Sequence, residues 1–352
     1  MTLYDAVSDL PLRIDGYECA YPERETSSGF TRTTTVVSLS GDGKHGRGED
    51  VTYDSEAHYA LRDGGDDMRL DLTGAYTVDS FSERLSKLDL FFGKTPEQSV
   101  FRNYRRWAFE SAALDLALKQ AETNLAKQLN RAYEPVRFVV STRLGEPPSA
   151  ERIDAWLSRD SNLEFKLDPT PEWTEALAER LAATEAVRIL DLKGLYEGTT
   201  VDQDADPALY ESVLETFPDA LIEDPKLTDE TRPLFRGHES RVTWDYPIRD
   251  VESVESLPWE PEYLNIKPSR FGSIRSLLDA LEYCQRKEIR CFGGGQFELD
   301  VGRQHLHALA SLFYPDAPND VAPSGYNDPE PENDLPSSPL SPPDRAEGIE
   351  WD

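Results

Sequence analysis

Five consecutive apolar runs of the chain each end in a charged residue, in the order Lys166, Asp191, Glu223, Asp245 and Lys267. Neighbouring strands of a sheet lie about 4.8 Å apart, so acids at the ends of three successive strands can converge on one ion. Three carboxylates that leave coordination positions open are typical of a Mg²⁺ site, with Mn²⁺ as the alternative. The pattern therefore predicts Asp191, Glu223 and Asp245 as metal ligands.

The two lysines stand on either side of the three acids in chain order. A lysine beside a divalent cation has its pKa lowered, which suits it to act as a general base. Taken singly, a strand-end acid is more often a helix cap or a turn residue, and Asp224 before Pro225 is an example. Turns have no reason to order the signs as lysine, three acids and lysine, so we predict Lys166 and Lys267 as catalytic residues.

A repeated strand–helix pattern accounts for these positions. Apolar or β-branched runs recur at residues 136–142, 163–168, 187–194, 220–225, 241–247, 263–269 and 289–298. Amphipathic helical stretches lie between them, for example at residues 171–186 and 272–288. Repeated βα units predict a parallel sheet. Seven such units, with an eighth strand near residues 319–323, favour a closed α/β barrel whose chemistry lies at the carboxyl ends of its strands.

The part of the chain before the barrel has a different character. Residues 10 to about 95 are rich in β-strand formers, and residues 30–41 predict a strand. Residues 41–54 are interpreted as a glycine-rich loop that lacks the features of a P-loop. Helical spacing over residues 97–130 predicts one long helix or two joined ones.

We therefore expect three segments. They are an α+β domain at residues 1–132, a barrel that carries the active site at residues 133–323, and an irregular acidic, proline-rich tail at residues 324–352.

Composition limits the classes of partner. Asp and Glu number 67 against 37 Lys and Arg, so the formal net charge is -30 at pH 7. This charge argues against nucleic acid and anionic membranes as partners. The acidic, lysine-poor surface fits a halophilic source or an ordinary acidic enzyme. Three cysteines without metal-site spacing, no signal peptide and no long apolar run predict a cytoplasmic protein.

At this point the motifs resemble those of the enolase superfamily, on the side of muconate-lactonizing enzyme and o-succinylbenzoate synthase. The likeness covers roughly residues 10–325 and rests on the sequences "LDLKG", "LIEDP", "TWDYP", "LNIKPSRFGS" and "GGGQFELDVG". It implies an N-terminal α+β capping domain followed by a (β/α)7β TIM-like barrel. It also implies Asp191, Glu223 and Asp245 as ligands and Lys267 at the acid/base position.

The resemblance implies a Mg²⁺-dependent enzyme that abstracts a proton α to a carboxylate through an enediolate intermediate. A lyase is slightly favoured over an isomerase, with dehydration or cycloisomerisation of the o-succinylbenzoate synthase kind. The alternatives are an epimerase of dipeptides or amino-acid derivatives and a non-catalytic metal-binding barrel. The expected partner is a small carboxylate substrate, a homo-oligomer is compatible with the sequence, and no organic cofactor is implied.

The sequence departs from the family pattern at two positions. That side of the superfamily usually has Lys-x-Lys on its second strand, and here Asp168 stands in place of the second lysine. Lys193 stands where Asn is usual and adds a cation near the metal site. We expect Asp168, Lys193, Asn265 and Glu298 to support the site.

Mobile lids over the active site are expected from the capping domain, by resemblance. They are predicted at residues 20–31 and 46–58. Arg32 and Arg47 are interpreted as solvated surface arginines, with the anchoring of a distal anionic group as the alternative role.

Overall fold

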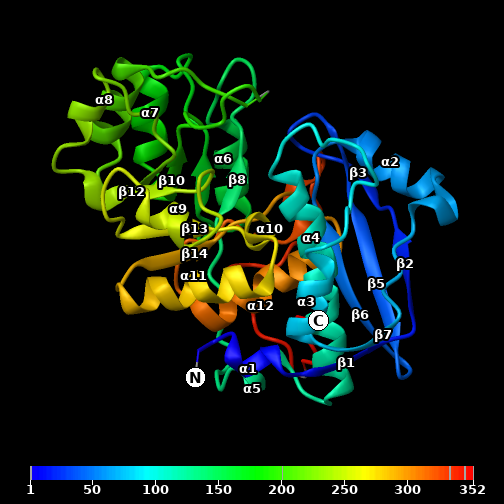
Figure 1. Ribbon diagram of the computed structural model, residues 1–352. Helices are drawn as coiled ribbons and strands as arrows, with labels where there is room; N and C mark the ends of the chain where they lie inside the picture. The colour runs from blue at the N-terminus through cyan, green and yellow to red at the C-terminus, as the bar shows by residue number, and fades with distance from the viewer. Residues whose placement is uncertain (1, 200, 333, 345, 352) are drawn as a thin grey trace.

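The computed structural model describes residues 2–199, 201–332, 334–344 and 346–351, so the predicted outer limits at residues 1 and 352 lie outside it. The chain forms two lobes (Figure 1). An N-terminal lobe, here called the cap, carries the elements from α1 to α5, and the barrel lobe carries the parallel strands with their helices.

The cap is a small antiparallel sheet packed on a long helix. Its helices are α1 Asp5–Ser8, α2 Ser55–Asp63, η1 Gly65–Met68, α3 Val78–Leu85, α4 Phe101–Gln120 and α5 Leu125–Gln128. Its strands are β1 Pro11–Ile14, β2 Gly16–Ala20, β3 Glu23–Glu25, β4 Thr31–Thr33, β5 Thr35–Gly41, β6 Lys44–Asp50 and β7 Gly74–Thr77. Strands β2, β5 and β6 form the three-stranded sheet, which lies beside α4 in Figure 1.

The barrel lobe alternates short strands with helices. Its strands are β8 Val140–Thr142, β9 Phe165–Leu167, β10 Val187–Asp191, β11 Leu221–Glu223, β12 Val242–Trp244, β13 Tyr263–Ile266 and β14 Arg290–Gly293. Its helices are α6 Glu151–Arg159, α7 Glu175–Ala182, α8 Pro207–Thr216, η2 Arg232–Phe235, η3 Glu239–Arg241, α9 Val251–Glu255, α10 Pro268–Phe271, α11 Ile274–Arg286, α12 Val301–Phe313 and η4 Ser324–Asn327.

All seven barrel strands pair in parallel and in chain order, from β8 to β14. Each lies inside one of the seven predicted runs, so the predicted parallel sheet is confirmed. The eighth strand expected at residues 319–323 is reduced to two single bridges. Asn319 pairs with Phe138 next to β8, and Asp320 pairs with Gly294 next to β14. These bridges join the two edges of the sheet and bring Asp320 to the same end as the strand-end charges.

The glycine-rich stretch at residues 41–54 is not a loop, and that prediction is wrong. Residues 44–50 form β6, which pairs along its whole length with β5. The glycines are there because α4 crosses the strand closely. A Cβ on Gly46 would lie 2.2 Å from the carbonyl oxygen of Ala112, and one on Gly48 would lie 2.0 Å from that of Ala108.

Both predicted lid segments contain regular structure. The segment 46–58 contains residues 46–50 of β6 and the start of α2, so only residues 51–54 of it lie outside helix and strand. The segment 20–31 contains β3, which pairs with β4 in a hairpin.

Replacing Gly48 with Ala is expected to destabilise the protein by about 1–3 kcal/mol, the usual cost of overpacking, because the carbonyl of Ala108 belongs to a rigid helix. Gly16 is the matched control, since a Cβ there would meet only the hydroxyl of Ser40 at 3.8 Å. Urea unfolding followed by tryptophan fluorescence measures both variants. Equal unfolding midpoints for the two variants would contradict the close-packing explanation of the glycine pattern.

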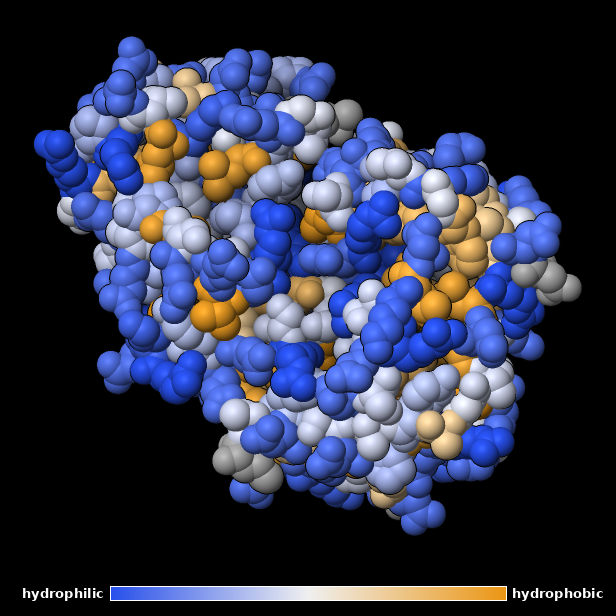
Figure 2. Space-filling model, viewed as in Figure 1, coloured by the Kyte–Doolittle hydropathy of each residue, from blue (hydrophilic) through white to orange (hydrophobic). Residues whose placement is uncertain are grey.

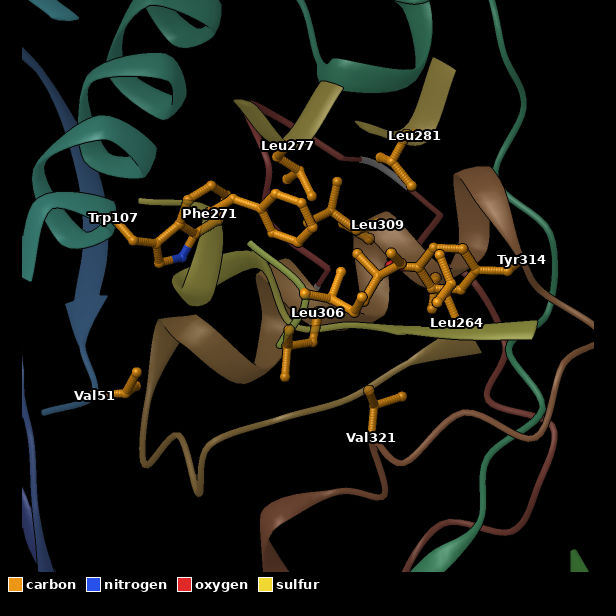
Figure 3. Packing of buried hydrophobic residues seen from close by; sticks show 14 of the residues in the cluster. Val51, Trp107, Leu264, Phe271, Leu277, Leu281, Leu306, Leu309, Tyr314 and Val321 are labelled. Atoms are coloured by element: carbon orange, nitrogen blue, oxygen red, sulfur yellow. The ribbon is translucent and has the colours of Figure 1, made fainter. Parts of the chain in front are cut away.

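The predicted helical stretch at residues 97–130 becomes two helices, α4 and α5. Almost every side chain of α4 from Phe101 to Lys119 is buried, because β6 packs on one side of the helix and α10 on the other. Figure 3 shows Trp107 of α4 close to Phe271 of α10, with Leu277 of α11 beyond it. The apolar core therefore continues from the cap into the barrel lobe and holds the two together.

The tail after residue 324 returns along both lobes. Leu340 pairs with Val136 ahead of β8, and Gly348 pairs with Asn124 at the start of α5. Trp351 is buried, and its ring meets that of Tyr133 edge-on. Within the described ranges, no helix has both the length and the apolar character needed to cross a bilayer.

Candidate active site

The five strand-end residues lie together at the carboxyl edge of the sheet. Lys166 lies within β9, Asp191 and Glu223 are the last residues of β10 and β11, and Asp245 and Lys267 directly follow β12 and β13. Asp191 and Glu223 are register partners in the sheet. The three carboxylates are fully buried, and the two lysines are at most 7% exposed.

Lys166 lies among acids. Its ammonium group is 3.2 Å from a carboxylate oxygen of Asp191 and 3.4 Å from one of Asp320, and it bonds Glu223 directly. The sequence around Asp320 does not mark it as a site residue. The barrel-closing bridge to Gly294 places it here.

Asp245 has a different set of partners. The Lys267 ammonium lies 2.8 Å from its Oδ2 atom, and the Arg270 guanidinium lies 3.4 Å from the same atom. The hydroxyl of Tyr196 donates to Oδ2 at 2.7 Å. The other oxygen, Oδ1, is buried and has no hydrogen-bond partner among the described residues.

Arg270 and Tyr196 are not among the site residues predicted from the sequence. Arg270 could have been found, because it stands three residues after Lys267 and a helical turn returns it over the site. Tyr196 gave no signal. It comes from the irregular segment after β10 and reaches an acid 49 residues away.

The two residues that depart from the family pattern lie side by side. The Lys193 ammonium bonds Asp191 and lies 3.8 Å from a carboxylate oxygen of Asp168. Lys193 has φ 52°, a conformation that is uncommon for a residue with a side chain. Its ammonium also lies 5.0 Å from the ring centre of Tyr196. Position 168 therefore places a carboxylate on this side of the site. The ammonium group there belongs to Lys193, which follows the next strand, β10.

The remaining supporting residues divide into two groups. The side-chain amide of Asn265 donates to Glu223 at 3.2 Å, so Asn265 belongs to the cluster. Glu298 lies 3.1 Å from the guanidinium of Arg303 and accepts the backbone N–H of Gln296 at 2.7 Å. Glu298 thus orders the loop after β14.

The pKa values of the buried acids shift in opposite directions, because burial raises them and neighbouring cations lower them. Burial raises the pKa of Glu223 well above its ordinary value, and burial together with Asp245 raises that of Asp224 to about 7. Burial would also raise the pKa of Asp191, but the Lys193 and Lys166 ammonium groups hold it well below its usual range. Arg270 and Lys267 have the same lowering effect on the pKa of Asp245 against its burial.

The carboxylate oxygens of the site are the kind of ligand that a hard divalent cation prefers, and they lie close together. Three buried carboxylates meet at one sheet edge, and the free Oδ1 atom of Asp245 is an oxygen that a cation could bind. The wider cluster holds more acids than cations. The acids are Asp168, Asp191, Glu223, Asp224, Asp245 and Asp320, and the cations are Arg143, Lys166, Lys193, Lys267 and Arg270. Formally the acids outnumber the cations by one.

The side chains of Asp191, Glu223 and Asp245 are not arranged as a complete set of metal ligands. Among the residues that the structure describes, no three Asp, Glu, His or Cys side chains are arranged to hold a metal ion. The reason is visible in the contacts, since the Lys166 ammonium lies between Asp191 and Glu223. To complete the set, this ammonium must move aside. Asp191, Glu223 and Asp245 as ligands therefore stay a prediction.

The cap covers one side of the site. Arg32 is only 2% exposed and donates to backbone carbonyls of Val51, Thr52 and Gln296, so its interpretation as a solvated arginine is wrong. Tyr53 donates to the side chain of Gln296 at 3.1 Å. Figure 2 shows hydrophilic side chains along the boundary between the two lobes.

Comparison with known proteins identifies the family. Residues 132–328 match the C-terminal domain, and residues 5–128 the N-terminal domain, of a family described as a domain of unknown function, DUF8230. An o-succinylbenzoate synthase of Listeria innocua is 25% identical over 225 residues, which are 62% of this chain. The matched part spans only 58% of that relative's length.

Solved structures show the same fold. A member of the enolase superfamily from Listeria innocua has a TM-score of 0.68 at 21% identity, covering 89% of this chain and 86% of the other. A dipeptide epimerase of Methylococcus capsulatus, complexed with Mg ion, gives 0.65 at 16% identity, with 88% and 89% covered. Muconate lactonizing enzyme of Pseudomonas putida gives 0.62 at 17% identity, with 88% of each chain covered. The chain therefore belongs to the DUF8230 family and has the fold of these enolase-superfamily structures, a capping domain on a TIM-like barrel.

Proposed function

We propose that the protein is a Mg²⁺-dependent acid/base enzyme that abstracts a proton α to the carboxylate of a small substrate. One observation carries the proposal. Two lysines and three acids, contributed by five successive parallel strands, form one buried cluster at the edge where barrel enzymes place their chemistry. Such a cluster is costly to bury, so it is better explained by function than by stability.

Each residue has a role in this proposal. Asp191, Glu223 and Asp245 would hold the cation, which when bound would bind the substrate carboxylate and offset the charge that develops as the proton leaves. Lys267 takes or returns the proton on the Asp245 side. Lys166 does so on the Asp191 and Glu223 side, once its ammonium group leaves the acids.

Two relatives support different reaction classes. The curated relative is named an o-succinylbenzoate synthase, and the Lys-Pro-Ser run at Lys267 is of that kind, so we favour a lyase that eliminates a β leaving group. The alternative is epimerisation of a dipeptide or amino-acid derivative, which a structural neighbour named a dipeptide epimerase supports.

A non-catalytic metal-binding barrel is the second candidate. It is favoured by Asp168, which directly follows β9 and stands in place of the family's second lysine, and by the three carboxylates that pair with Lys166. Such a barrel would bind Mg²⁺ without exchanging a substrate proton.

The test is exchange of the α-proton with solvent. A panel of carboxylic acids, including dipeptides and N-acyl amino acids, is incubated in D₂O with Mg²⁺ and followed by proton NMR. The wild type is expected to exchange at least one of them. Replacing Lys267 with Ala is expected to slow exchange by about 10²–10⁴-fold, the usual contribution of a general base.

Lys226 provides the matched control. It is a surface lysine of the same lobe, paired with Glu197 at 3.1 Å, and its replacement with Ala should leave exchange unchanged. Undiminished exchange in the double variant Lys166→Ala/Lys267→Ala would disprove the roles of both lysines. Mg²⁺ binding with no exchange on any acid would favour the non-catalytic barrel.

A further inference from the structure

The cap contains a cavity of its own, of about 420 Å³. It lies among strands β2, β5 and β6 of the cap sheet, the segment from α2 to residue 70, residues 90–92 and the first half of α4. Every lining residue falls between Tyr17 and Phe109, so the cavity is separate from the site at the barrel strands. Its size falls in the range of about 300–1000 Å³ that is typical of small-molecule sites.

Two charged residues at the base of this cavity, here called its floor, already have partners within the protein. Arg105 and Asp50 form an ion pair at 2.7 Å, and both side chains are at most 3% exposed. Asp50 also accepts the hydroxyl of Thr52, and Arg105 donates to the carbonyls of Ala57 and Leu90. Since these charges satisfy each other, the floor is polar but offers little net charge to a ligand.

The walls are aromatic. The rings of Tyr17 and Phe109 meet edge-on with centroids 5.8 Å apart, and Tyr21 and Phe92 also line the space. The hydroxyl of Tyr17 accepts the backbone N–H of Leu70 at 2.8 Å, which fixes the ring in place. Aromatic side chains such as these favour contact with a flat apolar body.

Besides the floor pair, the charged lining residues are Glu18, Arg62, which pairs with Asp63 at 2.9 Å, and Arg69. The guanidinium carbon of Arg69 lies 5.1 Å from the ring centre of Tyr17, and one nitrogen donates to the backbone carbonyl of Tyr17. Within the described part of the chain, Arg69 forms no ion pair, although acids outnumber bases by 67 to 37. Four of its five N–H donors therefore remain for a ligand, and a guanidinium can bind a carboxylate through two parallel bonds.

We propose that this cavity binds a small organic monoanion with a flat apolar body, such as an aromatic carboxylate. The carboxylate pairs with Arg69, and the ring lies against Tyr17 and Phe109. The floor pair of Arg105 and Asp50 closes the space. The inference does not depend on the proposed function, because it shares no residue with the barrel site.

The experiment uses 4-fluorobenzoate as the probe, titrated into the full chain and followed by fluorine NMR. The wild type is expected to bind it at millimolar concentration or below, and 4-fluorobenzyl alcohol at least about tenfold more weakly, because only the anion forms a charge-assisted bond. Replacing Arg69 with Ala should weaken binding of the anion to the level of the alcohol. Arg69 is an exposed residue, so this variant is expected to fold.

Two further variants separate the cavity from the barrel. Replacing Cys19, which lines the cavity, with Phe should abolish binding by filling the space. Replacing Lys267 with Ala should leave binding unchanged. The proposal is overturned if the wild type does not bind the probe, if the Arg69 variant binds it as tightly as the wild type, or if binding is lost in the Lys267 variant.

Discussion

Replacing Glu223 with Gln is expected to abolish the stabilisation of the protein by Mg²⁺, whereas replacing its neighbour Asp224 with Asn is expected to leave most of it. The two acids are adjacent in sequence and both fully buried, yet they face different partners. Glu223 contacts Lys166 and Asn265 inside the strand-end cluster. The carboxylate of Asp224 accepts the backbone N–H groups of Asp245 and Tyr246, at 2.9 Å each.

Backbone geometry explains this division. Glu223 is the last residue of β11, and Asp224 follows with φ 47°, which turns its side chain back onto the next strand. Asp224 therefore orders the backbone around Asp245. Glu223 would bind the ion.

The measurement is the free energy of unfolding with and without MgCl₂, at ionic strength matched with KCl. A ligand present at 100 times its Kd stabilises a protein by about 2.7 kcal/mol. Loss of groups that merely support metal ligands lowers affinity by about 10–100-fold, so loss of a charged ligand should cost at least that much. The Asp224→Asn variant should be less stable than the wild type both with and without MgCl₂, but Mg²⁺ should stabilise it by about as much as it stabilises the wild type. Unchanged stabilisation by Mg²⁺ in the Gln variant would remove Glu223 from the metal site.

The placement of the strand-end cluster could be predicted because parallel strands impose it. The apolar residues in a run such as 220–225 predict a strand, and the acid that follows them marks where the strand ends. Parallel pairing then brings the ends of all these strands to one edge of the sheet. What the sequence could not supply is the pairing within the cluster. Whether Lys166 meets Glu223 or Asp168 depends on side-chain directions that no spacing encodes.

The failures have physical causes as well. Gly46 and Gly48 were interpreted as loop residues because glycine commonly marks turns, but here their missing Cβ atoms allow α4 to cross β6. Arg32 was interpreted as a surface residue because arginine usually is one, but the chain surrounds it with backbone carbonyls from both lobes. In both cases a long-range contact outweighs the local preference.

Asp115 is expected to be among the costliest single residues to lose, because it ties the tail to α4. Its carboxylate is fully buried and accepts the backbone N–H groups of Arg47 and Ile349, at 2.9 Å each. It also pairs at 2.9 Å with Lys119, which bonds Glu350 of the tail. Replacing Asp115 with Ala would leave a buried ammonium group without its inner partner and two backbone donors without an acceptor.

Breaking a buried ion pair by removing one partner costs about 3–5 kcal/mol, and we expect Asp115→Ala to fall in that range by urea unfolding. Asp15→Ala is the matched control, because Asp15 forms an ion pair with Arg13 at the same 2.9 Å, but both side chains are half exposed. Water screens that pair, so its loss should change stability little. Equal losses in the two variants would mean that the tail is not held through Asp115. A larger loss for Asp115, with limited proteolysis now cutting the chain near Gly348, would show that this carboxylate is what holds the tail in place.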